Sequence, residues 1–455
     1  MNTNRNNRNE EQDNNKDEIS SNGSTSSSSS SSTTTAETTT NCPSPLELLS
    51  EDVGGYWAPC REIPILSHPP SSLEFLRDYV SPSIPCIIRC AIVSLHNSDS
   101  DQEQQQDDPL HVTLDQLVEL AGDCVVTVNV TPDGHGDCVR HVMVEDDEHN
   151  QEPCAVVKMF VKPEEKKMTL RDFRRGLRSQ TPQSATTSSQ NFESRTELNR
   201  YPVVHRNQST ARNCLIPESD DCTANCVLYY SQQNDCLRTE LLSLFHANIF
   251  PSTFKFAEEA FGTGSPDAIN LWVGNEQSVS SMHKDHYENL FYVCSGEKVF
   301  TLCPPADVPF LHSGQYPSGT FCQVHADPSN RAMMWVVVPD SKSTSDIGMV
   351  EEIDMVQWME PDIQNYQMQY SDNTDNDYDN KFPLLKFAHP IEVRVKAGEM
   401  LYLPSLWFHR VTQSMETVGV NYWYDMKFDS KWCYFNFLQR LGERITSVAT
   451  LDRSL

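Results

Sequence analysis

The stretch HKDHYENLFYVCSGEKVF, residues 283–300, decides the fold because it predicts two β-strands and also holds candidate metal ligands. Aromatic and β-branched residues crowd it, and a Ser-Gly step in its middle predicts the turn of a β-hairpin. Two overlapping pairs, His283 with Asp285 and His286 with Glu288, each have the composition of half a metal site. Spacing alone does not choose between the two pairs.

Strand-forming residues dominate the chain from residue 226 onward. The segments NCVLYYS, DAINLWVG, IEVRVKAGEMLYLP and VGVNYWYDM are rich in β-branched and aromatic residues and are separated by Gly and Pro. Upstream, residues 71–80 and 168–177 have helical spacing, the second helix capped by Thr169. The sequence therefore predicts a mainly β fold with flanking helices, in which antiparallel strands close into a barrel or sandwich.

Polar, low-complexity segments divide the chain. Four regions are expected: a disordered Ser/Asn/Thr-rich tail (1–43), a helix and strand region that packs on the core (44–225), the jelly-roll (226–426) and a C-terminal helical segment (427–455). Loops are expected to be inserted near 96–108, 179–213 and 371–380, the last of them acidic. The aromatic C-terminal segment predicts either packing on the protein's own core or a homodimer interface.

Composition limits the partners and the compartment. The formal net charge of −29 argues against nucleic acid and anionic membranes, and it fits a basic protein or peptide. Fifteen scattered cysteines without a CxxC pair, and the absence of a secretory apolar segment, predict reduced thiols. No apolar run approaches the roughly 20 residues that span a bilayer. We expect a soluble protein of the cytoplasm, the nucleus or both.

A metal site is the strongest chemical signal. In a His-x-Asp strand motif both side chains point to one face, so His283 and Asp285 are able to ligate one ion. Two histidines and one carboxylate leave open coordination positions and suit non-haem Fe(II). His409, in AGEMLYLPSLWFHRVTQS, is the best candidate for the third ligand, although a single histidine in an apolar run is also typical of a core residue.

Lys298 supplies a second, independent signal. Strand alternation puts it on the face that carries Phe300 and Leu302, which are expected to be buried. An ammonium that faces a core needs an anionic partner or loses its charge. A dicarboxylate cosubstrate that reaches from the metal would provide this partner. The alternative is a lysine exposed on an edge strand.

Together, HKDHYENL, SGEKVFTLCPPADVPF, GEMLYLPSLWFH and VNYWYDM resemble the JmjC family of Fe(II)- and 2-oxoglutarate-dependent oxygenases, and most of all its lysyl hydroxylase branch. The resemblance also covers PCIIRCA, VTVNVTPDGHGD and VLYYSQQND, and it spans most of residues 60–440. It implies a double-stranded β-helix, that is, a cupin-like jelly-roll. It also implies Fe(II), 2-oxoglutarate as cosubstrate and O2.

Carried over position by position, the resemblance implies a role for each of several residues. The implied iron ligands are His283, Asp285 and His409, with His286 and Glu288 outside the triad. The implied 2-oxoglutarate site consists of Tyr229, Ser280, Lys298, Asn289 and Asn421, and Trp423 is implied as a wall of the catalytic pocket. Ser280 stands where relatives usually have threonine, and this exchange keeps the hydroxyl group.

The function implied by the resemblance is hydroxylation of a lysine side chain, at C3, in a GTP-binding protein of the translation-factor class, with succinate and CO2 as products. Three alternatives stay open: histone lysine demethylation, a histone-tail peptidase activity that has been assigned within this branch, and a non-catalytic cupin-like binding protein. The sequence alone reveals no nucleophile and general base for proteolysis. The intact ligand set and Lys298 argue against a non-catalytic protein.

Overall fold

The computed structural model describes residues 44–57, 62–92, 109–144, 155–180, 203–204, 226–327, 330–340, 353–363 and 381–451. The predicted tail 1–43 and the predicted insertions 96–108 and 371–380 lie outside these ranges. Most of the insertion 179–213 does so as well.

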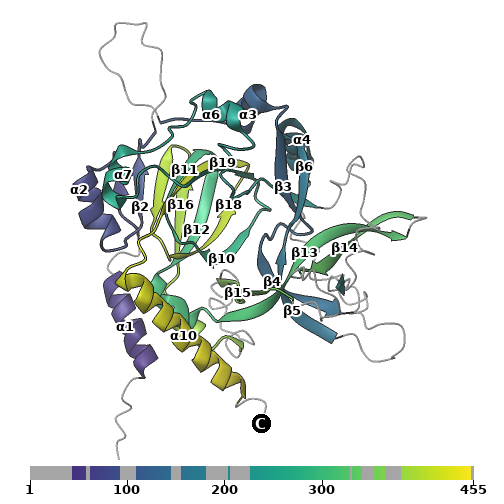
Figure 1. Ribbon diagram of the computed structural model, residues 1–455. Coiled ribbons are helices and arrows are strands. Elements are labelled where there is room, and N and C mark those ends of the chain that lie inside the picture. The colour runs from purple at the N-terminus through teal and green to yellow at the C-terminus, as the bar shows by residue number, and fades with distance from the viewer. Residues whose placement is uncertain are drawn as a thin grey trace, which may run out of the picture. The chain divides into compact units, whose positions relative to one another are not determined.

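Two facing β-sheets form the jelly-roll core (Figure 1). The larger sheet has the order β1(Ile65–Leu66), β2(Cys86–Arg89), β17(Glu399–Leu403), β11(Tyr287–Ser295), β19(Thr417–Asp425), β9(Ala268–Gly274). The smaller sheet has the order β10(Ser280–Lys284), β18(Phe408–Gln413), β12(Glu297–Cys303), β16(Ile391–Lys396). Apolar side chains of both sheets meet in one inner cluster, so the predicted closed β fold is confirmed.

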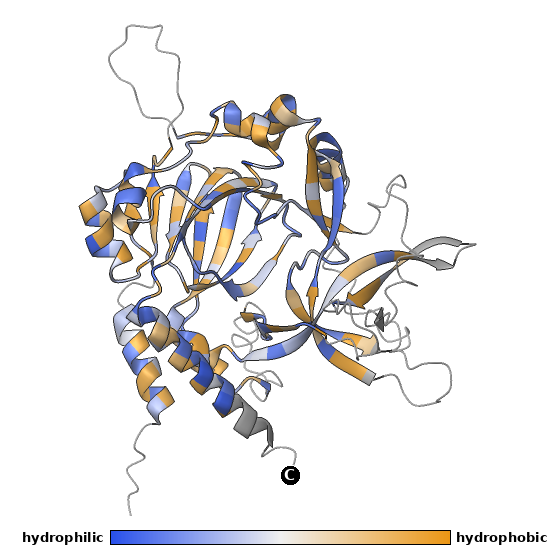
Figure 2. Cartoon of the chain, in the orientation of Figure 1, coloured by the Kyte–Doolittle hydropathy of each residue, from blue (hydrophilic) through white to orange (hydrophobic). Residues whose placement is uncertain are grey.

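The larger sheet is buried on both faces. In β11, Leu290 and Tyr292 point to an outer cluster, whereas Phe291 and Val293 point to the inner one. This strict alternation follows from the two-residue period of a strand. Helices cover the outer face, as Figures 1 and 2 show. They are α2(Ser72–Phe75) with its continuation η2(Leu76–Val80), α3(Leu114–Ala121), α4(Leu170–Ser179), α6(Leu242–His246) and α7(Lys255–Phe261).

The two helices that the sequence predicted upstream are confirmed. Residues 72–80 are helical, and the Ser71 side chain caps them by accepting a hydrogen bond from the Glu74 backbone N–H. Helix α4 begins after Thr169, whose hydroxyl accepts from the Asp172 N–H at 3.1 Å. Both caps satisfy a backbone donor that a helix leaves free at its N-terminus.

The predicted hairpin is wrong, although its two strands exist. Strand β11 pairs with β17 and β19 in the larger sheet, and β12 pairs with β16 and β18 in the smaller one. Gly296, with φ +79°, is therefore the point where the chain crosses from one sheet to the other. A Ser-Gly step supplies the positive φ that either arrangement needs, so the local sequence does not distinguish a hairpin from a crossover.

Two further sheets flank the jelly-roll. The three-stranded one has the order β6(Glu164–Thr169), β3(Val125–Thr131), β8(Val227–Tyr229). The six-stranded one has the order β14(Asn330–Pro339), β7(Val203–Val204), β4(Cys138–Val144), β5(Ala155–Lys162), β13(Ser313–Asp327), β15(Met355–Met359). Strands β13 to β15 were not predicted. Strands from the regions 44–225 and 226–426 thus share sheets, because β8 pairs with β3 and β13 pairs with β5.

Helices α1(Pro45–Trp57) and α10(Ser430–Leu451) both pack against the short helix η4(Pro305–Phe310). In α10, Phe435 is buried in an apolar cluster, and the partly buried Trp432 packs against the same cluster. The side chains of Tyr434 and Phe437 are 70% and 63% exposed. Packing on the protein's own core thus accounts for one stripe of this helix, and a dimer interface stays a prediction. Within the described ranges, no helix combines the length and the apolar character needed to cross a bilayer.

Candidate metal centre

Three candidate ligands from two strands and one connection meet at the edge of the smaller sheet. His283 of β10 and His409 of β18 are opposite each other in the strand pairing, and Asp285 follows directly after β10. Their ligand atoms all lie within 4.8 Å of one another. Asp285 Oδ2 lies 3.5 Å from His409 Nε2, and the two imidazole ring centroids are 4.2 Å apart. The structure thus brings the three predicted ligands together.

Backbone carbonyls orient both imidazoles. His283 Nδ1 lies 2.6 Å from the Ser281 carbonyl oxygen, and His409 Nδ1 lies 3.0 Å from the Trp407 carbonyl oxygen. A carbonyl oxygen only accepts, so Nδ1–H is the donor and the Nε2 lone pair is left for a metal. Burial lowers the pKa of His409 to about 4, which keeps this imidazole neutral at neutral pH. Two imidazoles and one carboxylate fit Fe(II) with open positions.

Lys298 is fully buried and lies on the inner face of β12, as strand alternation predicts. Its ammonium donates a hydrogen bond to the Tyr229 hydroxyl at 2.9 Å. No carboxylate in the described part of the chain pairs with it. Burial lowers the pKa of Lys298 to about 7. A buried cation with only a neutral partner is the group that an incoming carboxylate would stabilise.

Tyr229 connects Lys298 to β10. Burial raises the pKa of Tyr229, and the Ser280 hydroxyl beside it opposes this shift, so the phenol stays protonated at neutral pH. Gly274 lies so close that a Cβ there would meet the Tyr229 ring at 2.8 Å. The absence of a side chain at Gly274 therefore leaves the space that the Tyr229 ring occupies.

Amide and indole groups form the opposite wall. Trp272 Nε1 donates to Asn421 Oδ1 at 3.0 Å, and Asn421 Nδ2 donates to Asn289 Oδ1 at 3.4 Å. Trp423 stacks on Tyr287 with a centroid distance of 4.9 Å, and its buried indole N–H has no hydrogen-bond partner within the described residues. An unsatisfied buried donor at a cavity wall marks a position where a ligand can accept a hydrogen bond.

One cavity of about 30 Å³ unites these groups. All nine residues that the sequence singled out line it, namely Tyr229, Ser280, His283, Asp285, Asn289, Lys298, His409, Asn421 and Trp423. Trp272 and Phe291 also line it and were missed. Alternation along β11 could have found Phe291, since it lies two residues after Asn289. Trp272 lies on β9, where the sequence had singled out no residue from which alternation could start.

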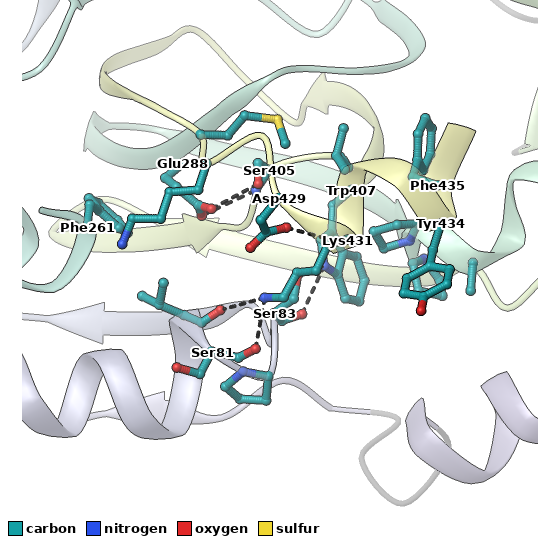
Figure 3. A pocket seen from close by; sticks show the side chains of 18 of the residues that line it. Ser81, Ser83, Phe261, Glu288, Ser405, Trp407, Asp429, Lys431, Tyr434 and Phe435 are labelled. Atoms are coloured by element: carbon teal, nitrogen blue, oxygen red, sulfur yellow. Dashed lines mark hydrogen bonds between the residues drawn. The ribbon is translucent and has the colours of Figure 1, made fainter. Parts of the chain in front are cut away.

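The second candidate pair points away from this centre, as predicted. Glu288 accepts hydrogen bonds from Tyr402 Oη at 2.7 Å and Ser405 Oγ at 2.9 Å, and the His286 ring lies 5.1 Å from the Trp432 ring. Glu288 lines a different and larger cavity of about 590 Å³, which we call the outer cavity (Figure 3). None of the three clustered ligands lines the outer cavity.

Comparison with known proteins places the chain and its fold in one family. A family model described as a cupin-like domain matches residues 71–430. JmjC domain-containing protein E of Dictyostelium discoideum is 32% identical over 378 residues, which cover 81% of this chain and 86% of that protein.

Two further relatives cover most of both chains. Lysine-specific demethylase JMJ32 of Arabidopsis thaliana is 32% identical over 412 residues, 88% of this chain and 94% of that protein. Bifunctional peptidase and (3S)-lysyl hydroxylase JMJD7 of Homo sapiens is 30% identical over 407 residues, 87% of this chain and 96% of that protein. The chain belongs to the cupin-like JmjC domain family.

Proposed function

We propose that the protein is an Fe(II)- and 2-oxoglutarate-dependent hydroxylase that acts on a lysine side chain of another protein. The observation that carries the proposal is Lys298, a buried ammonium without an anionic partner among the described residues, in the same cavity as the two imidazoles and one carboxylate of the metal centre. A metal-binding role alone would not need this lysine.

In this proposal His283, Asp285 and His409 hold the iron. Lys298 and Tyr229 bind the distal carboxylate of 2-oxoglutarate, and Ser280 supports Tyr229. Burial of Lys298 makes the resulting ion pair strong, because little water competes for either charge. When bound, iron and 2-oxoglutarate supply the oxidising chemistry: O2 is used to convert 2-oxoglutarate into succinate and CO2 and to insert one oxygen atom into a substrate C–H bond.

Asn289, Asn421 and Trp423 would line the same cavity beside the cosubstrate. Two successive hydrogen bonds, from Trp272 to Asn421 and from Asn421 to Asn289, fix both side-chain amides. Their polar atoms are therefore held in place before a ligand binds. The Trp423 indole N–H is left free to donate to the ligand. The surrounding apolar cluster would keep bulk water out.

For the substrate we propose a lysine, hydroxylated at C3, in a GTP-binding protein of the translation-factor class. The relative JMJD7 is named a (3S)-lysyl hydroxylase and covers most of this chain. The net charge of −29 favours a basic segment of the partner. Demethylation of histone lysines is the second candidate, since the relative JMJ32 is named a lysine-specific demethylase. It would release formaldehyde, which hydroxylation at C3 does not.

A Ser-His-Asp cluster bears on the peptidase alternative. Ser50 Oγ lies 3.4 Å from His389 Nε2, and His389 Nδ1 lies 2.9 Å from the fully buried Asp307. However, the Ser50 hydroxyl donates to the Phe387 carbonyl oxygen at 3.0 Å. Ser50 also lies inside α1, where backbone N–H groups bond within the helix and cannot stabilise an oxyanion. These hydrogen bonds therefore hold α1 against η4, and Ser50 is not placed to act as a nucleophile.

The test is incubation of the full chain with Fe(II), 2-oxoglutarate and a lysine-containing peptide from such a GTP-binding protein, followed by mass spectrometry. The expected result is a gain of one oxygen atom on one lysine, with an equal amount of succinate. Formaldehyde from a methylated histone peptide, without oxidation of the lysine peptide, would favour the demethylase instead. Failure to consume 2-oxoglutarate with any lysine peptide would contradict both.

A further inference from the structure

Strand β10 carries the candidate ligand His283 and departs from regular pairing just before it. The strand forms one edge of the smaller sheet, and its register with β18 shifts between Ser280 and His283. Two residues of β10, Ser281 and Met282, therefore face the single residue Arg410 of β18. Such a β-bulge bends the strand and interrupts the ladder. Pairing with β18 thus does not by itself fix the Ser281 carbonyl oxygen, which orients His283.

The Ser281 side chain is held from outside the smaller sheet. Its hydroxyl accepts a hydrogen bond from the Trp358 indole Nε1–H at 3.0 Å, and it donates to the Asp137 carbonyl oxygen. Next to this bond, Gly136 N–H donates to the Val279 carbonyl oxygen at 2.9 Å. A hydroxyl has one proton to donate, so the two bonds together fix its direction. Ser281 is therefore anchored between β15 and the connection from β3 to β4.

The Trp358 ring also lies beside the candidate ligand itself. The indole and the His283 imidazole are nearly parallel, with an interplanar angle of 5° and a centroid distance of 5.9 Å. Phe160 of β5 is buried and packs on the Trp358 ring at a centroid distance of 4.7 Å. Strand β15 pairs with β13, where Trp358 is opposite Gly314. The indole is thus held by its own sheet, and its bond to Ser281 connects that sheet to β10.

The second imidazole is positioned by the jelly-roll itself. His409 lies on β18, which pairs with β10 on one side and with β12 on the other. The carbonyl oxygen that orients it belongs to Trp407, a fully buried residue whose indole N–H donates to the Ser83 carbonyl oxygen at 3.0 Å. The two candidate imidazole ligands therefore differ, because His283 alone depends on bonds to a flanking sheet.

We propose that Ser281 and Trp358 are positioning residues for the metal ligand His283. The two bonds of the Ser281 hydroxyl hold the Ser281 carbonyl oxygen on His283 Nδ1–H, which keeps Nε2 free and directed at the metal. The Trp358 ring beside the imidazole limits its rotation. The six-stranded sheet, which supplies none of the three ligands, in this way contributes to metal affinity. The inference rests on the proposed function, because that function makes His283 an iron ligand.

The experiment titrates Co(II) into the metal-free full chain and follows the visible absorption of the bound ion. Binding that is lost in His283→Ala defines the site. Trp358→Phe keeps an aromatic ring beside His283 but lacks the indole N–H, and Ser281→Ala lacks the hydroxyl. Each variant is expected to weaken Co(II) binding at this site by about tenfold, because the imidazole is no longer held in one orientation. For the same reason the absorption spectrum of the bound Co(II) should change.

Gln357→Ala is the matched control on the same strand. Gln357 precedes Trp358 on β15 and bonds to α10, where it donates to Glu443 and accepts from Gln439 at 2.8 Å. The variant therefore loosens β15 and leaves the bond from Trp358 to Ser281 in place. It is expected to lower the urea midpoint of unfolding and to keep the wild-type Co(II) affinity and spectrum.

Three outcomes would overturn the inference. If Trp358→Phe or Ser281→Ala keeps the wild-type Co(II) affinity and spectrum, that residue has no positioning role and the proposed function stands. An equal loss of Co(II) affinity in Gln357→Ala and Trp358→Phe would show that any loosening of β15 has this effect, which also rules out the specific role. If His283→Ala binds Co(II) as the wild type does, the metal centre of the proposed function is wrong and the positioning role falls with it.

Discussion

The metal centre and the outer cavity lie on opposite sides of one short segment, residues 285–288. Asp285 points into the cavity of about 30 Å³ that holds the ligands, and Glu288 lines the outer cavity of about 590 Å³. In the smaller cavity, two buried polar groups lack a partner among the described residues. The Lys298 ammonium pairs with no carboxylate, and the Trp423 indole N–H has no hydrogen-bond acceptor.

In the outer cavity, several polar groups are hydrogen-bonded within the protein itself (Figure 3). Tyr402 and Ser405 bind Glu288, the Lys431 ammonium donates to the Ser81 carbonyl oxygen at 2.8 Å, and Trp407 Nε1 donates to the Ser83 carbonyl oxygen at 3.0 Å. Volume alone would have selected the outer cavity as the functional site. Buried polar groups without a partner identify the smaller one, because leaving them unpaired costs free energy that a ligand restores.

Loss of a metal ligand should have the largest effect. We expect His283→Ala or Asp285→Ala to lower turnover by at least about 1,000-fold and to remove bound iron, with the fold retained. His286→Ala is the matched control, because its ring packs on Trp432, and it should keep wild-type iron content. Turnover and metal content of the purified proteins measure this. Wild-type 2-oxoglutarate consumption in either ligand variant would show that the metal assignment is wrong.

Removal of the buried ammonium should have the next largest effect. Lys298→Ala is expected to raise the 2-oxoglutarate KM by about 100-fold, because a buried charge pair is lost. Lys431→Ala, a lysine of the outer cavity, should leave this KM unchanged. The affinity for 2-oxoglutarate without turnover is measured alongside, by calorimetry. An equal KM for 2-oxoglutarate in Lys298→Ala and wild type would show that Lys298 does not bind the cosubstrate.

The affinity for 2-oxoglutarate should fall as the pH rises above 7. In the free protein the pKa of Lys298 is about 7, so the ammonium loses its proton as the pH rises through this value. The bound carboxylate requires the protonated form, so binding takes up a proton and the dissociation constant rises by about tenfold per pH unit.

Calorimetry between pH 7 and pH 9 measures this slope, and buffers of different ionisation enthalpy report the proton uptake. Lys298→Arg is the control, because a guanidinium stays charged throughout this range, and its affinity should not vary with pH. A flat profile in the wild type would mean that Lys298 is already charged in the free protein.

A change in the outer cavity should have the smallest effect on function. Glu288→Gln keeps the shape but disturbs the bonds from Tyr402 and Ser405, so we expect a loss of about 1–2 kcal/mol in the free energy of unfolding. The value of kcat/KM should stay within about twofold of wild type. Urea denaturation and steady-state kinetics measure the two quantities. A loss of turnover as large as that of Asp285→Ala would show that the two cavities are not functionally separate.

Much of the candidate site could be predicted from local sequence. Alternation alone put Lys298 on the face of Phe300 and Leu302, and the structure buries all three on the inner side of β12. His283 and His409 followed from their residue types and from the resemblance, and β10 and β18 place them opposite each other. These predictions held because the period of a strand is a property of a few consecutive residues.

Only the tertiary structure decided which strands pair. It placed β11 and β12 in different sheets, and it joined β2, from far upstream, to β17. It also brought the Trp358 ring of β15, a strand that the sequence did not predict, to a centroid distance of 5.9 Å from the His283 ring. Pairing partners are chosen by packing between segments hundreds of residues apart, and no local period carries that information. The sequence by itself thus determined which residues are candidates for the site and which way they face, whereas the packing of distant strands decided what surrounds them.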